Sequence, residues 1–550
     1  MFSGLLDRRS GGSLDRRRTV RGGRRVTDRL RTGVVGALLS ILTASVAGAQ
    51  PAALGWHTSG ASILDPLGYR FVITGINWYG FETRDRVAHG LWTKDYKYIL
   101  DQARQYGYNT VRIPFSNDMW ERNPIPNNVS ACPECKGKTA RDILALIVNY
   151  AGSLGLHVIL DNHRSTAGNS AQENGLWYAR GYPEQSWIRD WVGVQEWVHG
   201  LPQSLADTIP VIYRAADGFP TVLGYDLRNE PHTPSRKAYS AGATWGSGDG
   251  IEPAVNPNPN PFTPVCIASS TCHDWRLAAE RAGDTILGEA AKNGWEYPLI
   301  FVEGLGLTPA DGGSHAAGPY DGYWWGGNLK GVNGNSTTPG APIVLNAGGN
   351  AADLGPAVYN QTVYSAHDYG PSLYRQSWFN SSTCYKSGCS PSSLADVWTR
   401  YWAHLNLPGG VSPVWPGQPS YPWENTGHIA YTQSPLFIGE FGTANAESDL
   451  SSSVAGSQGQ WNTDLINFIQ SSYLLTSLND SGFPVADLHW TYWALNDEDS
   501  YALLGANYAG LENARKEYSF LCFIQQGLLA VPWGSGSGRC GSTGSLPVPE

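Results

Sequence analysis

Two glutamates, Glu230 and Glu440, have the residue type and the sequence setting that acid–base or nucleophilic chemistry needs. Each ends an apolar run, Val222-Leu-Gly-Tyr-Asp-Leu-Arg-Asn-Glu230 in one case and Pro435-Leu-Phe-Ile-Gly-Glu440 in the other. A carboxyl group can act as a general acid, a general base or a nucleophile when its surroundings set its pKa. Either glutamate alone would most simply be a solvated loop residue, so their significance depends on whether the fold brings them together.

Other polar and aromatic side chains end similar apolar runs. They are Arg112, Asn229, His163, His367, Tyr369 and Trp493. A single histidine is usually structural, but the position of His163 and His367 at the end of a run favours a functional role. His157 opens its run instead, so we assign it no role.

These runs are predicted to be buried strands that alternate with helices. The eight predicted strands are Phe71–Trp78, Thr110–Pro114, His157–His163, Val222–Glu230, Pro298–Glu303, Val363–Tyr369, Pro435–Glu440 and Ala486–Trp493. Helical periodicity lies between them, for example over Asp95–Tyr106, Thr139–Leu154, Trp275–Asn293 and Trp461–Ser477. Eight strand–helix units in one chain predict a (β/α)8 barrel of the α/β class, over residues 54–530, rather than a doubly wound sheet.

The predicted barrel places both glutamates at one site. Active sites of such barrels lie at the carboxyl ends of the strands, so Glu230 and Glu440 should face each other across the barrel mouth. Paired carboxylates that flank a bond are the machinery of glycoside hydrolysis. A barrel needs about 250 residues, so this chain must carry long loop insertions at the C-terminal face. We place these in the Pro/Asn/Gly-rich stretches Gly242–Pro264 and Asn380–Asn425.

The N-terminal segment differs in composition from the rest of the chain. Residues 1–50 contain ten Arg and three Asp, followed by the apolar run Val34–Ala47 and a small-residue cleavage motif at Ala47–Gln50. This pattern predicts a secretory signal, with a signal anchor as the alternative. We therefore expect a signal peptide at 1–50, a catalytic barrel at 51–531, a Gly/Ser/Pro-rich tail at 532–550, and a secreted, extracellular protein.

Residues 51–550 hold 28 basic and 44 acidic residues, which is a net charge of −16. A surface this acidic repels phosphate backbones and anionic lipid. We therefore expect a neutral partner, with neither nucleic acid nor, after signal cleavage, a membrane.

Eight cysteines fall into near-neighbour pairs. The pairs are Cys132/Cys135, Cys266/Cys272, Cys384/Cys389 and Cys522/Cys540. Behind a signal peptide, such an even set predicts local disulfides. Cys132-Pro-Glu-Cys135 could alternatively form half of a zinc site, and Asp161-Asn162-His163 could contribute to a metal site, but neither has a second ligand set at a matching spacing. The sequence also lacks a phosphate-binding loop, a Gly-x-Ser-x-Gly elbow and a His-Glu-x-x-His pair. We expect no metal and no cofactor.

The sequence resembles glycoside hydrolase family 5. The resemblance rests on Asn229-Glu230-Pro231, Glu440-Phe441-Gly442, His367-Asp368-Tyr369, Arg112 and Trp493. Within that family, the runs Gly75–Thr83, Tyr323-Trp-Trp-Gly-Gly-Asn-Leu329 and Tyr364–Tyr369 are similar to the secreted endo-β-1,4-glucanase branch, the cellulases. The likeness extends over nearly all of residues 55–525.

The resemblance implies a role for each matching residue. Glu230 would be the general acid/base and Glu440 the nucleophile of a retaining double displacement, with their carboxyl groups about 5–5.5 Å apart. Arg112 and Tyr369 would hold Glu440 as an anion. Asn229 would point toward the sugar 2-hydroxyl or the nucleophile, and His163 and His367 would bind hydroxyls or tune Glu230.

Glucan chains present flat CH faces, so a cleft that binds them needs aromatic platforms. Trp493 is predicted to lie under the sugar that is cleaved, and Trp78, Trp324 and Trp325 are predicted to form flanking subsites. The predicted protein is thus a monomeric endo-β-1,4-glucanase acting on β-glucan polysaccharide or oligosaccharide. The alternatives are the same mechanism on mannan, xyloglucan or β-1,3-glucan, and a carbohydrate-binding barrel without turnover.

Overall fold

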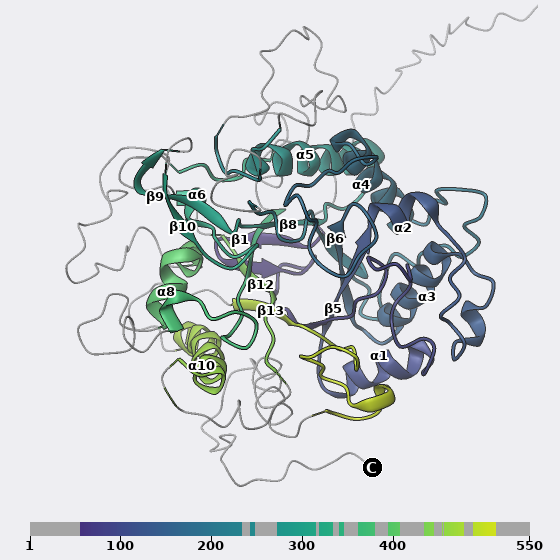
Figure 1. The fold of residues 1–550 in the computed structure, drawn as a ribbon. Coiled ribbons are helices and arrows are strands. Elements are labelled where there is room, and N and C mark those ends of the chain that lie inside the picture. The colour runs from purple at the N-terminus through teal and green to yellow at the C-terminus, as the bar shows by residue number, and fades with distance from the viewer. Residues whose placement is uncertain are drawn as a thin grey trace, which may run out of the picture. The chain divides into compact units, whose positions relative to one another are not determined.

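The computed structural model of this protein describes residues 55–233, 242–247, 272–314, 318–333, 340–345, 361–379, 394–406, 434–444, 454, 456–477 and 488–512. Eight parallel strands among them close into a barrel in the order β11-β12-β13-β4-β5-β6-β7-β8 (Figure 1). Their bounds are β4 (Thr74–Asn77), β5 (Thr110–Ser116), β6 (His157–Arg164), β7 (Val222–Asp226), β8 (Leu299–Glu303), β11 (Thr362–His367), β12 (Leu436–Glu440) and β13 (Leu488–Tyr492). The prediction of a (β/α)8 barrel is confirmed.

Helices lie around the strands, as Figure 1 shows. The α-helices are α1 (Tyr96–Gln105), α2 (Asn117–Arg122), α3 (Ala140–Ser153), α4 (Glu184–Val198), α5 (Trp275–Asn293), α6 (Lys330–Asn333), α8 (Leu394–Tyr401) and α10 (Gln458–Ser477). Short 3-10 turns occur at η1 (Pro133–Cys135), η5 (Ser377–Phe379), η6 (Ala403–Asn406) and η8 (Ala506–Tyr508). The four helices predicted from periodicity correspond to α1, α3, α5 and α10.

The ends of several helices are set by capping residues. The side chain of Asp95 accepts a hydrogen bond from the backbone N–H of Lys97 at the start of α1, and Thr139 caps α3 in the same way. Helix α5 begins after Asp274, whose side chain accepts from Leu277, and ends at Gly294, whose φ of 67° is left-handed. These side chains satisfy N–H groups that a helix leaves unpaired, which explains why the periodic segments stop where they do.

The amino end of the barrel is closed by an antiparallel sheet of β1 (His57–Ser59), β2 (Ser62–Leu64) and β3 (Arg70–Phe71). The buried side chains of this end form one apolar cluster, namely Trp56, Ile63, Ile73, Ile159, Leu223, Leu299, Phe301, Val363 and Phe437. His157 also lies at this end, with its ring 4.7 Å from that of Trp56 and its Nε2 3.0 Å from Asp217. Its position at the end of the barrel away from the carboxyl ends of the strands agrees with the absence of a predicted role.

Two segments outside the simple barrel pattern are described. After β8 the chain forms an antiparallel hairpin of β9 (Leu307–Ser314) and β10 (Gly318–Gly322), which was not predicted. The stretch 380–425 was predicted to be a loop insertion, yet its described part, 394–406, forms α8 and η6. Trp398 of α8 packs on Phe468 of α10, with ring centroids 5.0 Å apart, so this part belongs to the helical layer.

Several predicted features lie wholly or partly outside the described residues. The signal segment 1–50, the tail 532–550 and most of Gly242–Pro264 are among them. Cys132 and Cys135 have their sulfur atoms 1.97 Å apart, as the predicted pairing requires. Cys272 is also disulfide-bonded, whereas Cys266, Cys384, Cys389, Cys522 and Cys540 are not described. Within the described ranges, no helix has both the length and the apolar character to cross a bilayer.

Candidate active site

The carboxyl ends of the barrel strands bring the predicted residues together. Glu440 and His367 are the last residues of β12 and β11, and Asn229 and Glu230 follow the end of β7. His163 lies near the end of β6, Tyr369 is the second residue after β11, and Trp493 directly follows β13. Arg112 lies inside β5, which extends to Ser116, rather than at its end. The strand-end residues therefore surround one barrel mouth.

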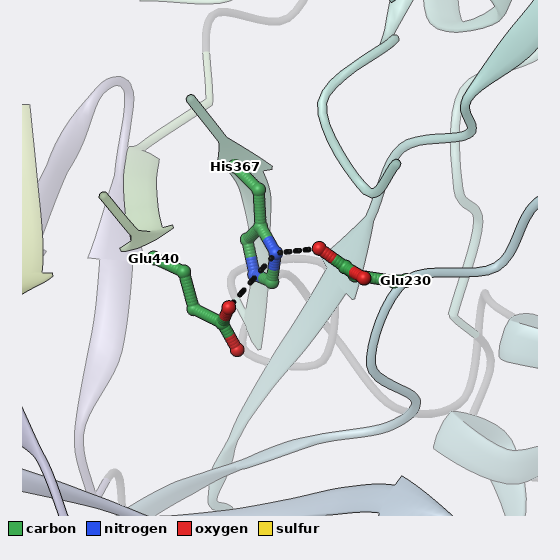
Figure 2. Close-up of side chains that lie close together, drawn as sticks. All are labelled: Glu230, His367 and Glu440. Carbon is green, nitrogen blue, oxygen red and sulfur yellow. Dashed lines mark hydrogen bonds and ion pairs between the residues drawn. The ribbon is translucent and has the colours of Figure 1, made fainter. Parts of the chain in front are cut away.

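The two glutamates face each other with His367 between them (Figure 2). Ligand atoms of Glu230, His367 and Glu440 all lie within 4.8 Å of one another. His367 Nδ1 is 3.1 Å from Glu230 Oε1 and 3.6 Å from Glu440 Oε2. This spacing fits a pair of carboxyl groups that react with the same atom, and it is shorter than the roughly 6.5–9.5 Å that inverting hydrolases need for an intervening water.

Glu440 is held as an anion by its neighbours. Arg112 Nη1 donates to its Oε1 at 2.9 Å, and the Tyr369 hydroxyl donates to its Oε2 at 2.9 Å. Burial raises the pKa of this carboxyl, but the positive charges of His367 and Arg112 and the Tyr369 hydrogen bond lower it by more, so the pKa lies below its ordinary value. Glu440 is thus an ionised, positioned carboxylate.

Glu230 has the opposite electrostatic setting. Burial and the nearby charges of Glu440 and Glu303 raise its pKa, although His367 partly offsets this increase. Its backbone φ is +48°, a left-handed conformation that is uncommon outside glycine. That conformation is fixed on both sides, because the Glu230 N–H donates to Glu303 Oε2 at 2.7 Å and its carbonyl lies 2.7 Å from His232 Nδ1. The two glutamates therefore have pKa values shifted in opposite directions.

Arg112 is the central cation of the site and is fully buried. Its guanidinium contacts four carboxylates, with nitrogen–oxygen distances of 2.9 Å to Glu440, 3.0 Å to Asp226, 3.1 Å to Asp161 and 3.2 Å to Glu303. A buried charge of this kind is tolerated only when it is paired and hydrogen-bonded on all sides. Burial and Glu303 together raise the pKa of Asp226 well above its ordinary value.

Glu303 also belongs to this cluster by its contacts, although its sequence position did not predict a site residue. Glu303 contacts Arg112 and the Glu230 N–H, and in addition Glu303 Oε1 lies 3.2 Å from His367 Nε2. Gly326, with φ +73°, packs directly on it, since a Cβ at that position would overlap Glu303 Oε2. The sequence did contain an indication of this position, because Glu303 ends its apolar strand just as Glu440 does. It lacked a family motif that would distinguish it from a solvated residue.

Asn229 and His163 support the site from the other side. Asn229 Oδ1 accepts from Arg112 Nη2 at 3.2 Å, and its Nδ2 lies 3.2 Å from His163 Nε2. His163 Nδ1 is 2.7 Å from Asp161 Oδ2. Burial lowers the pKa of His163, but the charge and hydrogen bond of Asp161, together with the charges of Glu440 and Glu82, raise it above its ordinary value. Asn229 is thus oriented by two neighbours, and it still borders the cavity above the glutamates.

A cavity of about 650 Å³ opens over the two glutamates. Its aromatic lining includes Trp493, Trp324, Trp325, Tyr369 and Tyr501. Trp493 is backed by Tyr79, with nearly parallel rings 5.3 Å apart, and Trp325 is 43% exposed and stacks on His232 at 3.7 Å.

The prediction of a sugar platform at Trp78 is wrong. This indole is 1% exposed in the apolar core, and its Nε1 donates to the carbonyl of His89. The side chain next to a strand end can point outward into the helical layer as well as into the mouth, and sequence alone does not separate the two. Tyr79, the next residue, stacks on Trp493.

The ligand atoms of Glu230, His367 and Glu440 are close enough to surround a cation. Their present partners fit a catalytic pair better. Burial lowers the pKa of His367, but the neighbouring carboxylates raise it well above its ordinary value, which favours the positively charged ring, and Arg112 Nη1 already donates to Glu440. A second cation at this point would meet electrostatic repulsion.

Comparisons with known proteins agree with this geometry. Residues 67–415 match the family model described as cellulase, glycosyl hydrolase family 5. The chain is 31% identical to an endoglucanase of Paenibacillus polymyxa, over 80% of this chain and 79% of the relative. It is 26% identical to the major extracellular endoglucanase of Xanthomonas campestris, over 85% and 70% of the two chains.

Among solved structures, it resembles a cellotetraose complex of an endocellulase from Pyrococcus horikoshii. The identity is 25% and the TM-score is 0.59, with coverage of 86% of this chain and 100% of the other. The match to the family model and the extent of similarity to the Paenibacillus endoglucanase show that this chain belongs to glycosyl hydrolase family 5, the cellulase family.

Proposed function

We propose that this enzyme hydrolyses internal β-1,4-glucosidic bonds of cellulose or related β-glucans by a retaining double displacement. The observation that carries the proposal is the facing pair of carboxyl groups, Glu230 and Glu440, which have one oxygen each within 4.8 Å of the other and which line a cavity together with tryptophans. Retaining enzymes place these groups about 5–5.5 Å apart, because one of them attacks the sugar directly.

In the first step, Glu440 attacks the anomeric carbon while Glu230 protonates the departing glycosidic oxygen. The lowered pKa of Glu440 keeps it ionised for the attack, and the raised pKa of Glu230 keeps a proton available for the leaving group. His367 Nδ1 engages Glu230 Oε1, which leaves Oε2 to hold that proton. The products of this step are a covalent glycosyl-enzyme and a shortened chain.

In the second step, Glu230 acts as a general base toward a water molecule, which attacks the anomeric carbon and releases Glu440. Arg112 and Tyr369 support the carboxylate that re-forms, since both donate hydrogen bonds to it. Asn229 borders the cavity, with its amide oriented by Arg112 and His163, and we assign it to the sugar 2-hydroxyl. Two inversions at the same carbon leave the anomeric configuration unchanged.

The substrate proposal rests on the aromatic lining and on the relatives. Trp493, Trp324 and Trp325 offer apolar surface for the CH faces of glucose rings. The relatives from Paenibacillus polymyxa and Xanthomonas campestris are endoglucanases, and the Pyrococcus horikoshii enzyme was solved with cellotetraose. Each of these observations favours a β-1,4-glucan over a substrate without a flat sugar face.

A reducing-sugar assay on carboxymethyl cellulose, mannan, xyloglucan and laminarin tests the substrate. We expect the highest kcat/KM on carboxymethyl cellulose, with a rapid fall in viscosity that marks internal cleavage. No release of reducing ends from carboxymethyl cellulose, together with release from one of the other polymers, would reassign the substrate while keeping the mechanism.

The Xanthomonas relative is an extracellular enzyme, which supports the proposal that this protein is exported and that residues 1–50 are removed as a signal peptide. We propose that the mature enzyme acts as a monomer. N-terminal sequencing of the protein recovered from culture medium, combined with light scattering, tests both statements. A mature chain that starts upstream of residue 34 would contradict the signal assignment.

A further inference from the structure

A second pocket, of about 760 Å³, lies beside the catalytic cavity. Its lining residues are Arg84, Arg86, Asp118, Glu121, Arg122, Thr166, Ala167, Arg180, Gly181 and Tyr182. They come from the loop after β4, from α2 and from the loop after β6. The loop after β6 connects the two spaces, because it supplies Thr166 and Ala167 to this pocket and 169–171 to the catalytic cavity. Both spaces are therefore built on the carboxyl ends of the strands.

The arginine pocket, as we call these ten residues, has an excess of positive charge. It contains four arginines against Asp118 and Glu121. Asp118 is almost fully buried, and both of its carboxylate oxygens already have partners. Arg86 Nε lies 2.5 Å from Oδ2. Arg122 Nε lies 2.6 Å from Oδ1, and the Tyr182 hydroxyl donates to the same oxygen at 2.8 Å. Glu121 pairs with Arg189, a residue outside the pocket, at 2.9 Å. Neither carboxylate is available to the remaining arginines.

Arg84 and Arg180 are those remaining arginines. Both are exposed, and no carboxylate in the described part of the chain pairs with either guanidinium. An unpaired surface arginine is ordinary by itself. Two of them lining one concave space, next to two further arginines, make a site of positive potential on a chain whose formal net charge is −9.

The position of Arg86 shows that the pocket is organised by the fold. Its backbone φ is +53°, a left-handed conformation that arginine rarely adopts. The conformation is held by a hydrogen bond from its N–H to the carbonyl of Thr83 at 3.1 Å, by one from its Nη1 to the carbonyl of Arg84 at 3.0 Å, and by the contact with Asp118. Strained residues of this kind concentrate at functional sites.

We propose that the arginine pocket binds carboxylate groups carried by an acidic β-glucan chain whose backbone lies in the catalytic cavity. A guanidinium group presents two parallel N–H donors that match a carboxylate, and a pocket continuous with the substrate-binding loop would meet substituents of the bound chain. This inference rests on the proposed function and specifies a substrate class for it: anionic, carboxylate-bearing glucans. Inorganic phosphate offers similar oxygen geometry and is the competing source of an anion.

The test compares two soluble derivatives of the same backbone, carboxymethyl cellulose and neutral hydroxyethyl cellulose. The double variant Arg84→Gln/Arg180→Gln removes the two unpaired charges without leaving a buried partner. We expect kcat/KM on carboxymethyl cellulose to fall about fivefold at low ionic strength, mainly through KM, from the weakening typical of two exposed ion pairs. Activity on hydroxyethyl cellulose should be unchanged.

Two controls make the result specific to the pocket. Arg104→Gln removes a charge that is also exposed but lies on α1, outside the pocket, and should leave the ratio of the two activities as it is in the wild type. Raising the NaCl concentration to about 0.5 M should lower that ratio in the wild type and leave it unchanged in the double variant, because salt screens exposed charges. The wild-type half of this salt measurement does not depend on the folding of any variant.

Three outcomes overturn the inference. One is an equal change on both polymers, and another is no change on carboxymethyl cellulose. The third is calorimetric binding of inorganic phosphate that the double variant loses while the polymer ratio stays constant, which would assign the pocket to a small anion. Absence of activity on both polymers in the wild type would instead refute the proposed function, so the two failures are distinguishable.

Discussion

Replacing Tyr369 with phenylalanine tests how Glu440 is kept ionised. The variant loses the hydroxyl that donates to Glu440 Oε2 at 2.9 Å, while Arg112 keeps its contact with Oε1 at 2.9 Å. A hydrogen bond to a charged group contributes about 1.5–3 kcal/mol, and one pKa unit corresponds to about 1.4 kcal/mol. Because this hydrogen bond lowers the pKa of Glu440, its loss must raise that pKa. We expect an increase of about one unit, the lower end of the range, since the guanidinium remains.

The assay is the pH dependence of kcat/KM on a soluble aryl β-cellobioside. Activity requires ionised Glu440, so the acid limb of the profile should move to higher pH by about one unit. At a fixed pH on that limb, kcat/KM should be about tenfold lower than in the wild type. Tyr501→Phe is the matched control, because Tyr501 lines the same cavity but its hydroxyl lies 3.3 Å from Ser372 rather than on a carboxylate. An acid limb that moves equally in both variants, or in neither, would refute the reasoning.

Four further predictions have defined outcomes. Glu440→Ala should abolish turnover, and azide should restore it with a product of inverted configuration; an inverted azide product from Glu230→Ala would mean that the two roles are exchanged. Glu303→Gln should lower kcat at least about tenfold with little change in KM, because Glu303 contacts the Glu230 N–H and His367 rather than the cavity. Steady-state kinetics test this, and an effect mainly on KM would contradict it. Trp78→Ala should lower the free energy of unfolding by about 3–5 kcal/mol, whereas Trp493→Ala should raise KM at nearly unchanged stability; thermal unfolding and kinetics on both variants check this. Chelation with EDTA should leave kcat unchanged, because no proposed step uses a metal, and a loss that calcium reverses would reveal a structural ion.

The barrel could be predicted because its signals are local and repeated. Each inner strand is a short apolar run, and three of the predicted helices, α1, α3 and α5, also begin at a capping side chain, as Thr139 shows for α3. The helical segment 394–406 was less visible, since it lies between stretches rich in Pro, Gly and Ser that suggested one long loop. The hairpin of β9 and β10 has no alternating apolar pattern in Leu307–Ser314, so its sequence did not indicate strands.

The residues of the candidate site that could be predicted are those at strand ends or within family motifs. Glu230, Glu440 and His367 end or follow strands, and closure of the barrel was enough to bring them together. The direction of a side chain was not predictable, which is why Trp78 was placed in the cleft although its indole packs outward. Glu303 was missed for a different reason. It is identified only by its contacts with Arg112, Glu230 and His367, which come from three other strands or the loops after them, and the sequence of a single strand does not contain that information.

The packing of Gly326 on Glu303 has a consequence for how this enzyme can change. Two neighbours of that glycine, Trp324 and Trp325, line the cavity over the two glutamates, while Glu303 accepts a hydrogen bond from the backbone N–H of Glu230. Any side chain introduced at 326 would displace the carboxylate below it. Variation in substrate preference along this wall should therefore occur by exchange of the tryptophans themselves, with the small residue beneath them kept, and directed-evolution libraries that randomise the whole loop should return glycine at that position.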